Sequence, residues 1–327
     1  MEQVTQKKLA LFAGRNSEAL ARAVAAGLSV ELGQANVAEF ANGEIHCRFD
    51  GSIRGQDVFI LNTHSAWEGR SINDSMIEHL IMVDAANRAS AKRITAVMPF
   101  YGYGRQDRKS AGREPITAKL VANMFSAAGA DRLLSVDLHS GQIQGFFDGP
   151  VDHLTAMPVL IEYLKALETD DLVVVSPDAG RVKVAERYAN QLGAALAIVH
   201  KRRSVEEKNQ VVAKDVVGEV EGRTCVLIDD MIDTGGTIVA AAEELAERGA
   251  AAIIAATTHP VLSGEAVDRL KNSVIETVVV TDTLPIGPEK RFDKLVVLSV
   301  AEIITKAIEA VFMDTTVSDI FEGENQG

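Results

Sequence analysis

The sequence predicts an α/β protein of two similar domains, each with a largely parallel sheet flanked by helices. Short apolar segments alternate with longer amphipathic segments along the chain, as in proteins built from strand–helix–strand units. Alanine, valine and isoleucine are frequent and aromatic residues make up only 5%, which suits helices packed closely on a parallel sheet. A length of 327 residues is enough for two domains of ordinary size.

The two halves of the chain share the same plan. In each half an acidic residue ends one strand and a basic loop follows another. The strands expected in the first half lie at 8–12, 58–62, 93–99 and 133–138, with helices at 73–89 and 117–128. Those of the second half lie at 172–176, 195–200, 224–228, 252–257 and 278–281, with a helix at 181–192. Turn-forming residues near 150–158 mark the boundary, so the expected domains are 1–155 and 156–327.

Charge and cysteine content exclude several classes of protein. The formal net charge of −13 argues against nucleic acid or an anionic membrane as a partner. The two cysteines, Cys47 and Cys225, form no C-x-x-C pair, which disfavours a disulfide framework or a zinc site and fits a reducing compartment. No stretch of 18 apolar residues occurs, so we expect a soluble cytoplasmic protein.

The segment from Cys225 to Ile238, CVLIDDMIDTGGTI, carries the strongest chemical signal. It begins as an apolar strand, continues with Asp229 and Asp230, and passes through the turn DTGGT at 233–237 into a helical run. A glycine-rich turn before a helix offers free N–H groups and a partial positive charge to a phosphate. The two carboxylates can accept hydrogen bonds from sugar hydroxyls or hold a divalent cation. The alternative is a capped turn without a ligand, but the combination favours a phosphorylated sugar.

Further polar residues follow other expected strands. The loop FYGYGRQDR holds Arg105 and Gln106, which could donate hydrogen bonds to a nucleotide; the alternative is a solvated surface loop. His139 ends a strand, and a lone histidine there is more often structural than a ligand. Together with Asp178, which ends another strand, it could hold magnesium, since this ion takes few protein ligands and prefers phosphate oxygens.

Two segments depend on their context for an interpretation. Lys201-Arg202-Arg203 closes a strand and leads into a polar run. It is either a solvated basic end or part of a loop that brings positive charge to a polyphosphate in the transition state. Asn42-Gly43-Glu44 is a turn by composition and by itself indicates no function.

Taken together, these segments resemble the ribose-phosphate diphosphokinases. The similarity covers nearly the whole chain and is greatest to actinobacterial members. Its motifs are RQDRK, REPITAKL, SPDAGR, KRR, DDMIDTGGT and the block DRLLSVDLHSGQIQGFFDGPVDH at 131–153. The resemblance implies two domains of the type I phosphoribosyltransferase fold, a homo-oligomer of hexamer type, and Mg²⁺ as cofactor. It implies ATP and ribose 5-phosphate as substrates, with the β,γ-diphosphoryl group passing to the C1 hydroxyl and AMP leaving.

The resemblance also implies a role for each matching residue. Asn42, Gly43 and Glu44 would reach the adenine of ATP from a neighbouring subunit, and Arg105 and Gln106 would bind ATP. His139 and Asp178 would hold magnesium, and Lys201 and Arg203 would form the catalytic pair. The residues implied for ribose 5-phosphate are Arg203, Asp229, Asp230, Asp233, Thr234, Gly235, Gly236 and Thr237.

Some positions depart from the family pattern. Many members have Asp where this chain has Asn42, and the segment 110–114, SAGRE, has one arginine fewer than is common. That loop lies near the regulatory site at which phosphate and ADP act as effectors in the family. Two alternative functions remain. A phosphoribosyltransferase would explain DDMIDTGGT but not the block 131–153. A non-catalytic regulatory homologue would tend to lose Lys201 and Arg203, and both are present.

Overall fold

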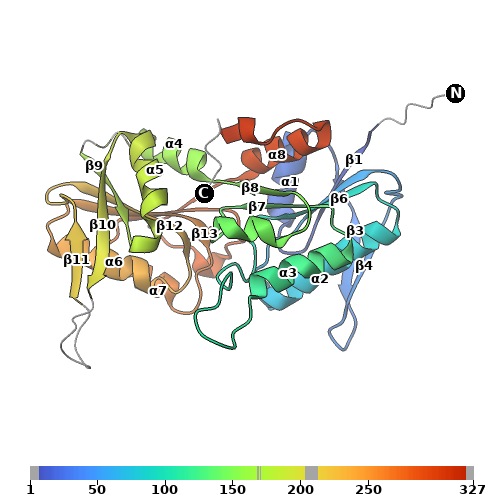
Figure 1. Ribbon diagram of the computed structural model, residues 1–327, viewed down its shortest axis with the longest axis horizontal. Helices are drawn as coiled ribbons and strands as arrows, with labels where there is room; N and C mark the ends of the chain where they lie inside the picture. Colours follow the sequence, from blue (N-terminus) through green and yellow to red (C-terminus); the bar gives the residue numbers. More distant parts are fainter. Residues whose placement is uncertain (1–6, 168, 170, 203–212, 322–327) are drawn as a thin grey trace. The chain divides into compact units, whose positions relative to one another are not determined.

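The computed structural model describes residues 7–167, 169, 171–202 and 213–321, which form two units. The first unit comprises the described residues of Met1–Thr155, Thr283–Pro285 and those from Ser299 onward. The second comprises those of Ala156–Asp282 and Ile286–Leu298. The α/β class predicted from the sequence is confirmed, because both units contain a largely parallel sheet with helices packed against it (Figure 1).

A six-stranded sheet forms the centre of the first unit, in the order β2-β1-β5-β6-β7-β8 with every pairing parallel. Figure 1 shows α2 and α3 on one face of this sheet and α1 and α8 on the other. The strands are β1 Leu9–Ala13, β2 Leu32–Gly33, β5 Asp57–Leu61, β6 Arg93–Met98, β7 Arg132–Val136 and β8 Val151–Leu154. The helices are α1 Glu18–Gly27, α2 Ile72–Arg88, α3 Thr117–Ala128 and α8 Ala301–Met313. A short 3₁₀ helix, η1 Gly141–Phe146, follows β7.

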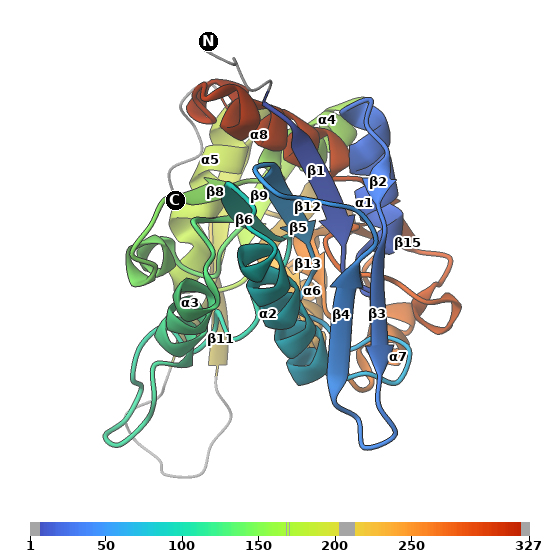
Figure 2. The same ribbon diagram turned by 90° about the vertical axis from the view of Figure 1, so that its right-hand side faces the viewer.

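A separate antiparallel hairpin extends from the first unit. It consists of β3 (Ala35–Glu39) and β4 (Ile45–Phe49), which form a two-stranded sheet of their own. Figure 2 shows the hairpin projecting beyond the strands of the six-stranded sheet. At its inner end Phe49 packs against Phe12 of β1, with ring centroids 4.5 Å apart. The hairpin is therefore anchored at its base and exposed at its tip.

The C-terminal helix α8 packs with the first unit, although the sequence-based division placed 156–327 in a second domain. The reason is a set of contacts that a linear division cannot show. Helix α8 packs on α1, where Gly27 lies against the side chain of Thr305. Just after α8, the carboxylate of Asp314 accepts hydrogen bonds from Lys7 Nζ at 2.7 Å and from Arg93 Nη1 at 2.6 Å.

The second unit contains a seven-stranded sheet in the order β11-β10-β9-β12-β13-β14-β15, in which only the β10–β11 pair is antiparallel. Its strands are β9 Leu172–Ser176, β10 Ala195–Arg202, β11 Ala213–Val217, β12 Thr224–Ile232, β13 Ala252–Pro260, β14 Thr277–Thr281 and β15 Leu295–Leu298. Its helices are α4 Met157–Ala166, α5 Val182–Leu192, α6 Gly236–Glu247 and α7 Ala266–Lys271. A 3₁₀ turn, η2 Ala179–Arg181, precedes α5.

The central strands of the second sheet are buried on both faces, which explains their continuous apolar sequences. On β9, Val174 packs with α4 and α5, whereas its neighbours Val173 and Val175 pack with α6 and α7. On β12, Val226 and Leu227 divide between the two layers in the same way. Alternate side chains of a strand point to opposite faces, so each strand contributes to both cores. This packing positions the ends of the strands rigidly.

The strand expected at 224–228 extends to Ile232. The physical reason is that its neighbour β13 is equally long, so that Asp229 pairs with Thr257 and Met231 with His259. The two acids therefore lie within the end of β12 instead of beyond it. Among the described residues, no helix is long and apolar enough to span a membrane.

Candidate active site

Polar residues gather at one edge of the second sheet, where β9, β10 and β12 end. Because β9 lies between β10 and β12 and pairs with both in parallel, the carboxyl ends of all three meet at the same edge. Asp178 follows β9, Lys201 lies near the end of β10, and Asp229 lies near the end of β12. The structure thus brings these predicted residues to one edge of one unit. Arg203 lies outside the described residues.

The turn between β12 and α6 has the form expected of a phosphate site. Gly235 has φ +75°, a left-handed conformation that favours glycine, and it is the N-cap of α6. Having no side chain, Gly235 cannot cap the helix, so the first N–H groups of α6 keep their donors for a ligand. Gly236 and Thr237 are exposed. Two hydrogen bonds to its backbone oxygens stabilise the turn: the Ser263 N–H donates to Asp233 O at 2.9 Å, and Arg269 Nη1 donates to Thr234 O at 3.0 Å.

The two acids at the end of β12 share an arginine that the sequence reasoning did not single out. Arg181 Nε lies 3.3 Å from Asp229 Oδ1, and Arg181 Nη2 forms an ion pair with Asp230 Oδ2. The side chain of Asp230 is only 6% exposed. Burial, together with the negative charge of Asp230, raises the pKa of Asp229, and Arg181 opposes the increase. The signal in the sequence was a basic residue shortly after a strand, within SPDAGR, but no pattern linked it to the acids of another strand.

In the first unit, the loop after β6 and the residues after β7 meet at the carboxyl edge of the six-stranded sheet. The backbone of Gly104 lies close to His139, because a Cβ atom placed on Gly104 would be 3.5 Å from the Cβ atom of His139. Arg105 is the next residue along the chain. Arg105 and Gln106 are exposed. The backbone turns sharply on both sides, with φ +63° at Tyr103 and +38° at Asp137. Such non-glycine conformations are strained and concentrate at functional sites.

Gln106 also anchors the loop to the following helix. Its side-chain oxygen accepts a hydrogen bond from Thr117 Oγ1 at 2.5 Å, and its backbone oxygen accepts one from Ala118 N–H at 3.2 Å. These bonds join the loop to the first turn of α3. The structure therefore brings Gln106 and His139 to one edge of the six-stranded sheet.

The tip of the hairpin does not join this group of residues within the unit. Asn42, Gly43 and Glu44 are exposed, and Gly43 has φ +88°, so the turn requires a glycine there. Asn42 Oδ1 accepts a hydrogen bond from the Glu44 N–H at 3.2 Å, which stiffens the turn. Figures 1 and 2 both show this hairpin apart from the loop between β6 and α3.

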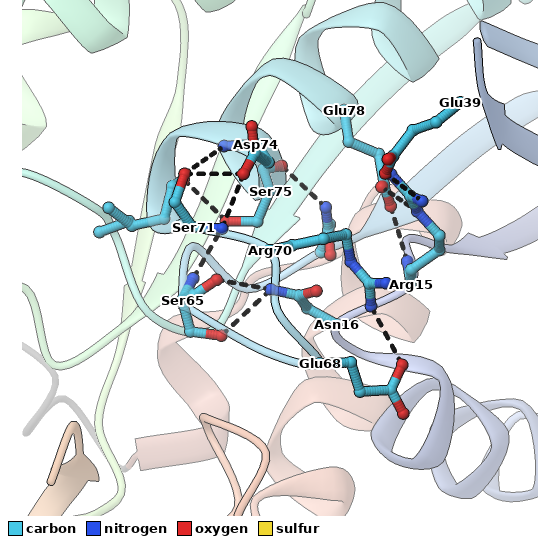
Figure 3. Close-up of polar contacts among 12 residues, drawn as sticks. Arg15, Asn16, Glu39, Ser65, Glu68, Arg70, Ser71, Asp74, Ser75 and Glu78 are labelled. Atoms are coloured by element: carbon cyan, nitrogen blue, oxygen red, sulfur yellow. Dashed lines mark hydrogen bonds and ion pairs between the residues drawn. The ribbon is translucent and has the colours of Figure 1, made fainter. Parts of the chain in front are cut away.

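Arg15 ties the hairpin to the core close to its turn, through the last residue of β3 (Figure 3). Its Nε and backbone N–H donate to the buried carboxylate of Glu78 on α2, at 2.6 and 2.7 Å. Its Nη1 donates to Glu39, the last residue of β3, at 2.6 Å. Helix α2 is itself fixed by a capping box, in which Ser71 and Asp74 bond reciprocally. The position of the hairpin thus depends on a network that no single motif predicted.

Two buried histidines hold the start of the loop that carries Arg105. The Gly102 N–H donates to His64 Nδ1 at 3.1 Å, His64 Nε2 lies 3.3 Å from His79 Nδ1, and His79 Nε2 lies 3.1 Å from Ile60 O. Since Gly102 can only donate and the Ile60 oxygen can only accept, both rings are neutral and each bears its proton on Nε2. Burial lowers the pKa of His79 to about 3 and also lowers that of His64 well below its usual value.

We expect stability to fall as the pH falls below about 6.5. Both rings stay neutral in the folded protein, whereas in the unfolded chain they take up protons near pH 6.5. This contribution is complete above the unfolded pKa and is lost on acidification toward the folded pKa, about 3 for His79. Each histidine should contribute a slope of about 1.4 kcal/mol per pH unit in the free energy of unfolding.

Urea unfolding of the wild type and of His79→Gln between pH 7 and pH 5 tests this slope. The raised pKa of Asp229 increases stability as the pH falls, which opposes the effect of the histidines. The test therefore compares the pH slopes of the free energy of unfolding of the two proteins, since Asp229 contributes equally to both. The free energy of unfolding of the variant should depend less steeply on pH, by about 1.4 kcal/mol per pH unit, than that of the wild type. Equal slopes for the two proteins would contradict a neutral His79.

His139 and Asp178, the residues predicted to hold magnesium, lie in different units and belong to no cluster of metal ligands among the described residues. Within the described residues, no group of three or more His, Cys, Asp or Glu could hold a metal ion. His139 belongs to the first unit and Asp178 to the second. The Asp178 Oδ1 accepts from Gly180 N–H at 2.8 Å, which orients the carboxylate at the start of η2. Magnesium keeps waters and takes phosphate oxygens with only one or two carboxylates, so an oriented aspartate fits this ion without a dedicated cluster.

Comparison with known proteins identifies the family. A family model described as the N-terminal domain of ribose phosphate pyrophosphokinase matches residues 9–129, and one for a phosphoribosyl synthetase-associated domain matches residues 205–322. Ribose-phosphate pyrophosphokinase from Streptomyces coelicolor is 53% identical over 318 residues, which cover 97% of each chain. The chain belongs to the ribose-phosphate pyrophosphokinase family. The resemblance inferred from the sequence motifs is therefore confirmed.

Other members of the family give the same picture. Ribose-phosphate pyrophosphokinase from Mycobacterium tuberculosis is 52% identical over 321 residues, which cover 98% of this chain and 97% of its own. A crystal structure of phosphoribosylpyrophosphate synthetase from Mycobacterium smegmatis matches with a TM-score of 0.88 at 52% identity, covering 94% of this chain and all of that one. The similarity to actinobacterial members, noted from the sequence, is confirmed.

Proposed function

We propose that this member of the family transfers the β,γ-diphosphoryl group of ATP to the C1 hydroxyl of ribose 5-phosphate. The products are 5-phosphoribosyl 1-diphosphate and AMP. The observation that carries the proposal is the convergence of an acidic pair, an uncapped helix N-terminus and Lys201 at one edge of the second sheet. Phosphate and sugar hydroxyls are the ligands that such an arrangement suits.

Ribose 5-phosphate would bind in two parts. The 5-phosphate would accept hydrogen bonds from the backbone N–H groups of the turn at 233–237, aided by the helix dipole of α6. The ribose 2- and 3-hydroxyls would donate to Asp229 and Asp230, which lie at the strand end before the turn. Binding at both the phosphate and the ribose hydroxyls would orient the C1 hydroxyl toward ATP.

ATP would bind to residues of the first unit. Arg105 and Gln106 are exposed at the carboxyl edge of the six-stranded sheet and offer planar donors for phosphate and base. Asn42, Gly43 and Glu44 would contact the adenine bound to a neighbouring copy, a role supported by the exposure of the hairpin tip. A homo-oligomer, of hexamer type as in the family, follows from that role.

The chemical step would need positioning and charge stabilisation. The C1 oxygen would attack the β-phosphorus in line while the bond from that phosphorus to the α-phosphate oxygen breaks. His139 and Asp178 would hold Mg²⁺, which when bound neutralises phosphate charge. Lys201 and Arg203 would stabilise the negative charge that shifts in the transition state. We place this activity in the cytoplasm, with phosphate and ADP as effectors acting near the loop at 110–114.

Incubation of the purified protein with ATP, Mg²⁺, phosphate and ribose 5-phosphate tests the proposal. AMP and 5-phosphoribosyl 1-diphosphate should form in equal amounts, and omission of ribose 5-phosphate should abolish both. No AMP under these conditions would favour a non-catalytic regulatory homologue. Release of pyrophosphate from 5-phosphoribosyl 1-diphosphate in the presence of a nucleobase, without AMP formation, would favour a phosphoribosyltransferase.

A further inference from the structure

Arg181 is placed where two neighbouring strands end. Strand β9 pairs in parallel with β12, from Leu172 opposite Thr224 to Val175 opposite Leu227. Strand β9 ends at Ser176, and the chain then passes through η2 to Arg181. Strand β12 continues past this point through Asp229 and Asp230. Strand β9 thus ends before the acids of β12, and the Arg181 side chain reaches both of them.

Arg181 contacts both carboxylates, Asp229 and Asp230. Its Nε lies 3.3 Å from Asp229 Oδ1 and its Nη2 pairs with Asp230 Oδ2. The Asp230 N–H also donates to Asp229 Oδ1, at 2.8 Å. The three side chains are 16%, 17% and 6% exposed for Arg181, Asp229 and Asp230, so water screens these charges only weakly. A planar guanidinium can bind two acceptors at once, which a lysine cannot do in the same geometry.

The charge of the pair depends on this arginine. Burial and the proximity of Asp230 both favour a protonated Asp229, and a hydrogen bond between the two carboxyl groups favours a shared proton. Arg181 favours the state in which both groups are ionised. Only ionised carboxylates offer all their oxygens as acceptors to sugar hydroxyls.

We propose that Arg181 is a positioning residue of the ribose 5-phosphate site, which holds Asp229 and Asp230 ionised and oriented toward the ribose hydroxyls. This inference rests on the proposed function. Arg181 acts through the acids, and its effect should fall on the binding of ribose 5-phosphate far more than on the binding of ATP. The turn at 233–237 keeps its own contacts and should hold the 5-phosphate in either case.

Steady-state kinetics of Arg181→Gln, Arg181→Lys and a control variant test the proposal. The glutamine variant should raise the KM for ribose 5-phosphate by about tenfold or more, the loss expected for one charge-assisted contact. Its kcat and its KM for ATP should stay within about threefold of the wild type. The lysine variant should recover part of the loss because it keeps the charge without the planar fork.

Arg248→Gln is the matched control. Arg248 lies in the same unit, is 41% exposed and pairs with Asp215 at 2.9 Å and Glu244 at 3.2 Å. Exposed pairs contribute little, so this variant should keep both KM values. A wild-type KM for ribose 5-phosphate in Arg181→Gln would overturn the proposal. So would an equal rise in the two KM values, which would indicate a general disturbance of the fold.

A double variant separates action through the acids from an independent contact. In an Asp230→Asn background, Arg181→Gln should raise the KM by a smaller factor than in the wild type, because its partner is already altered. An equal factor in both backgrounds would overturn the proposal. If the wild type forms no AMP, the proposed function fails, and calorimetric titration of the wild type and Arg181→Gln with ribose 5-phosphate still decides whether Arg181 supports binding.

Discussion

Lys201→Ala should lower kcat by about a hundredfold to a thousandfold, the loss seen when a positively charged or donor group is removed from a developing anion. Lys201 lies near the end of β10, beside the strand that leads to Asp178. As the diphosphoryl group moves, negative charge accumulates on oxygens that a compact ammonium can neutralise. The KM for ribose 5-phosphate should change little, because in the proposed site that substrate is held by the acids and the turn at 233–237.

The measurement is AMP formation under saturating ATP and ribose 5-phosphate. Lys165→Ala serves as the control, because it removes the same charge from an exposed position on α4 of the same unit. This control should keep wild-type turnover. Near-normal turnover in Lys201→Ala would exclude Lys201 from the catalytic step.

Glu78→Ala should destabilise the protein by about 3 kcal/mol, the usual effect of removing one partner from a buried ion pair. The side chain of Glu78 is 1% exposed and accepts from Arg15 Nε at 2.6 Å. Without it, the partly buried Arg15 keeps, among the described residues, its side-chain hydrogen bond to Glu39, and its backbone N–H loses its acceptor (Figure 3). The unpaired donors account for most of the loss.

Urea unfolding at neutral pH gives the change in the free energy of unfolding. Glu68→Ala is the control, because Glu68 is 64% exposed and lies 3.3 Å from Arg70, so its loss should change stability by about 0.5 kcal/mol or less. Adding Arg15→Met to Glu78→Ala should recover stability, since the unpaired charge is then also removed. A loss for Glu78→Ala no larger than that of the control would refute the role of this pair.

Much of the second unit could be predicted because its signals are local. The apolar runs of β9 and β12, the acids and the glycine turn lie within short stretches of sequence, and parallel topology brings the ends of neighbouring strands together. The length of β12 was underestimated, because strand length is decided by the partner strand β13. The glycine-rich turn was predicted from its composition, but only the structure shows that Gly235, and not Gly236, takes the left-handed conformation.

The contacts of Arg181, Glu78 and His79 could not be predicted in the same way. Each joins residues from different elements, and the sequence contains no spacing that relates them. Arg181 reads as an ordinary basic residue at the start of a helix until β9 and β12 are known to be neighbours. Glu78 and His79 read as polar positions of an amphipathic helix, yet both are buried.

The sequence by itself determined the α/β class and the family, and it predicted the short motifs for phosphate, sugar and nucleotide, because each depends on residues a few positions apart. Only the tertiary structure decided which charged groups are paired, that α8 packs with the first unit, and that β9 ends early enough for Arg181 to reach both acids. The physical reason is the range of the interactions. Backbone conformation and binary pattern are local, whereas burial and ion pairing depend on elements that meet only after folding.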